Sequence, residues 1–74
     1  MKQNIIEPKF NVGDNIKLKA LTKNNKIVKI PGKILTNNTI DYLLLNAVYD
    51  IEVINEQKEK IVYMHINEQF IGKA

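Results

Sequence analysis

The feature that most constrains the fold is a pair of strand-like segments, residues 48–54 and 60–66, joined by the polar stretch Asn55-Glu56-Gln57-Lys58-Glu59. In the first segment, apolar residues recur at every second position, which is typical of a half-buried β-strand. A short polar connection between two such segments is typical of a β-hairpin. The sequence therefore predicts a mainly β protein with an antiparallel hairpin at its centre.

The register of this hairpin follows from the requirement that one face be apolar. The pairs expected on the apolar face are Tyr49 with Ile66, Ile51 with Met64, and Val53 with Val62. The pairs expected on the other face are Asp50 with His65, Glu52 with Tyr63, and Ile54 with Ile61. A shift by one residue mixes apolar and polar residues on both faces. We therefore expect Tyr63 and His65 to point outward.

Further short strands precede the hairpin. Residues 15–20 alternate between apolar residues and lysine, and residues 32–36 form a second candidate strand. Between them, Asn24-Asn25 tolerates the left-handed backbone of a tight turn, so residues 21–29 are interpreted as a long, hairpin-like first loop. Residues 36–39 are interpreted as another turn, and Gly13 and Gly32 as turn residues.

Two segments mix helical and extended signals. Ile40, Leu43, Leu44 and Ala47 have helical spacing, which predicts one short helical turn around 40–46, although the same residues also suit a buried strand. Residues 67–71 predict a helical or 3₁₀ turn followed by a short last strand.

The length of 74 residues allows a single domain. We assign residues 10–71 to it, residues 1–9 to an arm or an added edge strand, and residues 72–74 to a tail. The chain lacks Cys, so packing alone must stabilise it. Residues 1–10 contain no apolar run of signal-peptide length, and no run of 18 apolar residues occurs, so we expect an intracellular protein without a membrane partner.

The residue types present exclude several chemistries. The chain has no Ser, Cys, Trp or Arg and a single histidine, His65. Without Ser or Cys the common nucleophiles are missing, and one histidine does not build a zinc site. We therefore expect no catalytic residues, no metal, no cofactor and no enzymatic activity. Without Arg, base-specific DNA recognition is also disfavoured.

Charge is divided unequally along the chain. Residues 1–35 carry eight lysines and two acids, and residues 36–74 carry three lysines and six acids, so the two parts have net charges of +6 and −3. The candidate nucleic-acid-binding residues are Lys17, Lys19, Lys23, Lys26 and Lys29. The alternative interpretation is that these lysines are solvated positions that protect sheet edges. Interleaved aromatic residues, on which bases stack, are missing from this part of the sequence.

The order of these pieces resembles an SH3-like small barrel. The motifs are Val12-Gly13-Asp14 before the first strand, Gly32-Lys33-Ile34, Tyr49-Asp50-Ile51-Glu52-Val53, the tight hairpin, and Tyr63 before a turn and last strand. Over residues 10–71 they are similar to the short phage-associated YorP-like proteins, whose function is unknown, and more distantly to KOW-type modules. The resemblance implies a five-stranded barrel in the cytoplasm of a bacterial host cell.

Three functions remain open at this stage. The first is a non-enzymatic interaction module, a phage or mobile-element accessory protein that binds a protein partner by occlusion or bridging; its candidate residues are Tyr63, His65, Ile54 and Ile61. The second is non-specific RNA or DNA binding by the lysine-rich part. The third, implied by the resemblance alone, is sequestration of a small nucleotide in an oligomer. The sequence does not determine whether the chain is a monomer or a homodimer.

Overall fold

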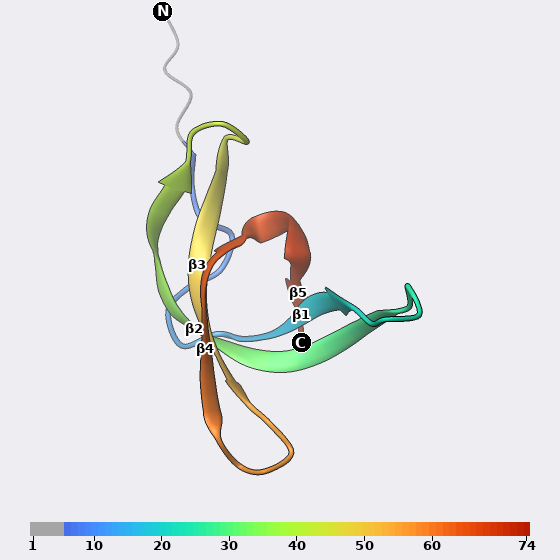
Figure 1. The fold of residues 1–74 in the computed structure, drawn as a ribbon. Coiled ribbons are helices and arrows are strands. Elements are labelled where there is room, and N and C mark those ends of the chain that lie inside the picture. The colour runs from blue at the N-terminus through green and yellow to red at the C-terminus, as the bar shows by residue number, and fades with distance from the viewer. Residues whose placement is uncertain (1–5) are drawn as a thin grey trace, which may run out of the picture.

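A computed structural model describes residues 6–74 and folds them into one five-stranded antiparallel sheet in the order β4-β3-β2-β1-β5 (Figure 1). The elements are β1 (Asn15–Leu21), β2 (Ile27–Asp41), β3 (Asn46–Ile54), β4 (Lys60–Asn67), the 3₁₀ turn η1 (Glu68–Phe70) and β5 (Ile71–Lys73). The predicted fold class, mainly β and five-stranded, is confirmed, and the small fold fits an SH3-like barrel. The turn and short last strand predicted after β4 are also present.

The strand β2 is shared by the two halves of the sheet. Its 15 residues pair with β1 up to Lys33 and with β3 from Lys33 onward. The pairing with β3 shifts between Ile34 and Thr36 and again between Thr36 and Thr39. Such irregularities bend a strand, and in Figure 1 the β1–β2 hairpin diverges from the β3–β4 hairpin. The turn predicted at residues 36–39 is therefore wrong, because these residues lie within β2.

The first loop is shorter than predicted. β1 continues to Leu21 and β2 begins at Ile27, so the turn contains only residues 22–26. Asn25 has a left-handed φ of 58°, the conformation that the Asn-Asn pair favours. The backbone N–H of Thr22 donates to the carbonyl of Lys26 at 2.9 Å. The hairpin extends further because pairing of the strands satisfies backbone groups that a loop would leave to water.

The helical turn predicted around 40–46 does not form. β2 runs through Ile40 and Asp41, and residues 42–45 make the turn of the β2–β3 hairpin. The carboxylate of Asp41 accepts from the backbone N–H groups of Leu43 at 2.9 Å and Leu44 at 3.2 Å. Both leucines are exposed, so their helical spacing meets no core against which a helix could pack.

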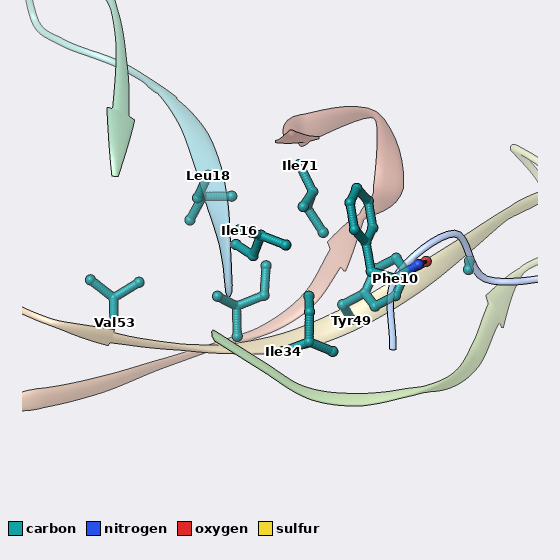
Figure 2. Close-up of a cluster of buried hydrophobic side chains, with 9 residues drawn as sticks. Phe10, Ile16, Leu18, Ile34, Tyr49, Val53 and Ile71 are labelled. Carbon is teal, nitrogen blue, oxygen red and sulfur yellow. Dashed lines mark hydrogen bonds between the residues drawn. The ribbon is translucent and has the colours of Figure 1, made fainter. Parts of the chain in front are cut away.

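The core lies between β1 with β5 on one side and β2 with β3 on the other (Figure 2). Its buried members are Phe10, Ile16, Leu18, Ile34, Ala47, Tyr49, Ile51, Val53 and Ile71. Gly32 lies within β2 and not in a turn as predicted. A Cβ atom at this position would approach Cγ2 of Ile51 to 2.8 Å, so the close packing of β3 requires glycine there.

Both ends of the described chain contact the sheet. Residues 6–9 form no strand, whereas the part of the predicted arm at residues 1–5 lies outside the described residues. At the other end, Gly72 and Lys73, which the sequence assigns to a tail, belong to β5 and pair with β1. No helix within residues 6–74 is long and apolar enough to cross a membrane.

Candidate functional site

The pairing of β3 with β4 changes register once along the hairpin. Tyr49 pairs with Ile66, as predicted. Beyond a shift between Tyr49 and Ile51, the pairs are Ile51 with Tyr63, Glu52 with Val62, Val53 with Ile61, and Ile54 with Lys60. The pairs predicted for this part of the hairpin are therefore wrong by one residue.

A β-bulge at His65 causes the shift. Between the two registers, Asp50 stands opposite two residues, Met64 and His65. His65 has a left-handed φ of 56°, and its backbone N–H donates to Oδ1 of Asp50 at 3.1 Å. The extra residue in β4 moves every following pair by one position. Asp50 and His65 are neighbours, as predicted, but the contact between them is the hydrogen bond from the backbone N–H of His65 and not a side-chain pair.

The shift divides the predicted protein-binding residues between two faces of the hairpin. Tyr63 and Ile61 pair with Ile51 and Val53 and so share the face that carries the core. They lie beyond the enclosed core, however, because 38% of Tyr63 and 36% of Ile61 remain exposed. Ile54 points to the opposite face, and His65 is exposed within the bulge.

Two residues that the sequence pattern predicts on the apolar core face are on the surface. Val62 is 50% exposed and Met64 is 65% exposed. A sequence signal for this exists in the unbroken apolar run Ile61-Val62-Tyr63-Met64, which departs from strict alternation. Such a run is compatible with a strand that presents apolar side chains on both faces, and it shows that alternation alone does not determine the register here.

The strand β4 is also an edge of the sheet. Within residues 6–74 it pairs only with β3, over eight residues from Lys60 to Asn67. One row of its backbone N–H and C=O groups therefore faces away from the sheet, where a further strand can pair. Exposed apolar side chains and an unpaired backbone edge thus occur together on β4.

The predicted nucleic-acid-binding lysines lie at the other end of the strand order, on the β1–β2 hairpin. Lys19 is directly opposite Lys29, and Lys17 is opposite Pro31, so these three lysines share one face. Lys23 and Lys26 lie in the turn. All five side chains are exposed. The structure therefore brings Lys29, which the sequence predicts to lie in the loop, to the same face as Lys17 and Lys19.

The most buried polar group in the core belongs to Tyr49, whose side chain is 0% exposed. Its hydroxyl donates to Oε2 of Glu68 at 2.6 Å and accepts from the backbone N–H groups of Lys9 at 3.0 Å and Phe10 at 3.3 Å. Burial, followed by the hydrogen bond to Glu68, raises the pKa of Tyr49 to about 12. The protonated hydroxyl links the backbone of residues 9 and 10 to Glu68 of η1, so its role is to stabilise the fold.

Within residues 6–74, no three His, Asp or Glu side chains gather as a metal site would require. By its fold, the chain is a small antiparallel β protein with one extended edge strand. Comparison with family models, curated proteins and solved structures found no match. The resemblance to YorP-like proteins and the nucleotide-sequestering alternative stay predictions.

Proposed function

We propose that the protein is a non-enzymatic interaction module that binds an extended segment of a protein partner as an added strand alongside β4. The observation that carries this proposal is the outer edge of β4, which no strand within residues 6–74 covers and whose exposed residues are mainly apolar. Long, flat apolar edges promote aggregation, and natural proteins usually protect them with charges, bulges or covering elements. Here the four residues 61–64 carry no charge.

The geometry of the edge limits the segment that it accepts. The bulge at His65 interrupts the regular strand, so the stretch suitable for pairing is Lys60–Met64. Main-chain hydrogen bonds to this stretch supply affinity, and side chains on alternate faces supply specificity. Val62 contacts a partner from one face, and Tyr63 and Ile61 do so from the other. The fitting partner is an extended, mostly apolar segment.

The mechanism is occlusion or bridging, without any chemical step. A strand added to β4 covers a surface of the partner or holds it beside a second molecule. The resemblance of residues 10–71 to phage-associated proteins supports a host or viral protein as the partner class. Tyr63 supports an interface role because tyrosine contributes strongly to binding energy when a partner covers it.

Site-specific photocrosslinking in bacterial cells tests this function. A photoreactive phenylalanine analogue replaces Met64 on the free edge or, as a control, Asn38, which is exposed on β2. We expect an adduct of defined mass from position 64 and none from position 38, because only position 64 lies beside the added strand. An adduct from both positions, or from neither, contradicts the proposal.

A matched pair of valine substitutions tests the role of the edge itself. Val62→Lys places a charge on β4, whereas Val12→Lys makes the same change at a valine that is 61% exposed outside the sheet. Both should leave the melting temperature nearly unchanged, since surface substitutions alter stability by about 0.5 kcal/mol or less. Only Val62→Lys should abolish the adduct. If Val62→Lys retains the adduct, the proposed role of the β4 edge is contradicted. If the adduct joins two copies of this chain, the proposal of a host or viral protein as the partner is contradicted.

A further inference from the structure

The outer face of the β1–β2 hairpin is strongly and uniformly basic. Lys17, Lys19 and Lys29 project from the face opposite to the buried side chains of Ile16 and Leu18. No acidic residue occurs between positions 15 and 40. Within residues 6–74 the only ion pair joins Lys9 to Glu68, so these three lysines have no carboxylate partner there. The face is therefore open to an external anion.

The pairing of Lys19 with Lys29 is unfavourable for the sheet on its own. Like charges directly opposite each other in an antiparallel pair are destabilising. Lys17 and Lys19 are two residues apart along β1, which separates them by roughly 6.6 Å. This is similar to the distance between neighbouring phosphates along an extended nucleic-acid strand. An anion with regularly spaced charges relieves the repulsion at several positions together.

An apolar pocket adjoins the lysines. It has a volume of about 500 Å³ and is lined by Lys19, Ala20, Leu21, Ile27, Gln69 and Phe70. Phe70 reaches this place because Ile71 of β5 pairs with Leu18 of β1. Its ring is 48% exposed. The fold thus supplies beside Lys19 an aromatic residue, which the stretch from Lys17 to Lys29 lacks in the sequence.

We propose that this face binds single-stranded nucleic acid, with phosphates on Lys17, Lys19 and Lys29 and a base stacked on Phe70. A basic surface next to an exposed aromatic ring is the combination with which proteins hold single strands without sequence preference. A duplex buries its base faces in its own stack and cannot use Phe70 in this way. This second binding site lies at the β1–β5 side of the strand order, and β4 is at the opposite edge.

Binding of a fluorescent oligothymidine of about a dozen nucleotides, measured by anisotropy, tests the proposal. With three lysine–phosphate contacts, an increase in salt from about 50 to about 200 mM should weaken binding roughly 20-fold. The variant Lys19→Glu with Lys29→Glu should weaken it by about tenfold or more. This double change retains a like-charged pair across the strands, so the fold should keep its stability.

The matched control is Lys58→Glu with Lys60→Glu, which changes the net charge equally on the β3–β4 hairpin. It should retain most of the affinity. Phe70→Leu keeps an apolar side chain in the pocket and should lose roughly fivefold or more in affinity, because leucine offers no ring for stacking. Equal losses in the two lysine variants, or full binding by Phe70→Leu, overturn the proposal. Equal affinity for a duplex also overturns it, as does binding only to vesicles of anionic lipid.

Discussion

At the scale of single residues, the hydroxyl oxygen of Tyr49 takes part in three hydrogen bonds. The hydroxyl joins the N-terminal segment at Lys9 and Phe10 to Glu68 of η1. The ring of Tyr49 also packs edge-on against Phe10, with centroids 5.6 Å apart. A buried hydroxyl is costly without partners. The tyrosine is therefore expected to remain protonated in the folded chain until the pH approaches its pKa of about 12.

The stability of the protein should fall at alkaline pH because of Tyr49. Its pKa is about 12 in the folded chain and about 10 in the unfolded chain. The stability that depends on the protonated hydroxyl is complete below pH ~10 and is lost as the pH rises towards ~12. The loss is of the order of 3 kcal/mol. Urea unfolding at several pH values measures it.

Two variants separate Tyr49 from other groups that titrate at alkaline pH. Tyr49→Phe should lower stability at neutral pH by about 1–2 kcal/mol, since it leaves the buried backbone N–H of Phe10 without its acceptor and removes the hydroxyl donor from Glu68, which keeps the backbone N–H of Lys9. It should also flatten the alkaline decline. Tyr63→Phe, at an exposed ring, should retain the full decline. An equally steep decline in Tyr49→Phe contradicts the assignment.

At the scale of elements, the bulge in β4 decides which side chains form the surface. It converts Val62 from a predicted core residue into an exposed one and moves Tyr63 to the side of Ile51. The bulge needs a left-handed residue, and His65 takes this conformation although it is not glycine. Left-handed backbone costs a non-glycine residue about 1–2 kcal/mol. Asp50 offsets part of the cost by accepting from the backbone N–H of His65.

Substitutions at His65 should therefore follow backbone preference. His65→Gly should change the free energy of unfolding by less than about 0.5 kcal/mol or increase it, because relief of the left-handed backbone opposes the greater freedom of the unfolded chain. His65→Val should destabilise by about 1–2 kcal/mol, since a β-branched residue resists positive φ. Denaturant midpoints measure both. Met64→Val is the control and should stay within about 0.5 kcal/mol. If His65→Val has the same denaturant midpoint as the wild type, the bulge is contradicted and the regular pairing of Ile51 with Met64 is supported.

Elements that depend on local pattern were predictable from the sequence, and those that depend on partner strands were not. The alternation of Tyr49, Ile51 and Val53 correctly indicates a strand and its core face. The helical spacing at residues 40–47 is misleading because β3 is available to pair with β2 there. The position of Phe70 beside Lys19 depends on the contact between β5 and β1, which no local pattern contains.

At the scale of the whole molecule, the unequal charge of the two halves becomes a spatial division. Lys17, Lys19 and Lys29 cover one face of the β1–β2 hairpin, and the acidic residues Glu56 and Glu59 lie in the connection between β3 and β4. Self-repulsion within the basic hairpin opposes folding, and dissolved salt screens it. The proposed nucleic-acid site therefore costs stability in the free protein.

This cost predicts that one substitution raises stability and weakens binding. Lys19→Glu puts an opposite charge across from Lys29 and should stabilise the fold by about 0.2–1 kcal/mol, which raises the melting temperature by a few degrees. Lys58→Glu, beside the acids of the β3–β4 connection, should give no gain. Added salt should raise the melting temperature of the wild type more than that of Lys19→Glu, because the variant has less repulsion to screen. Scanning calorimetry at about 50 and about 500 mM salt measures both effects. A lower melting temperature for Lys19→Glu, or the same response to salt in both proteins, contradicts the repulsion between Lys19 and Lys29.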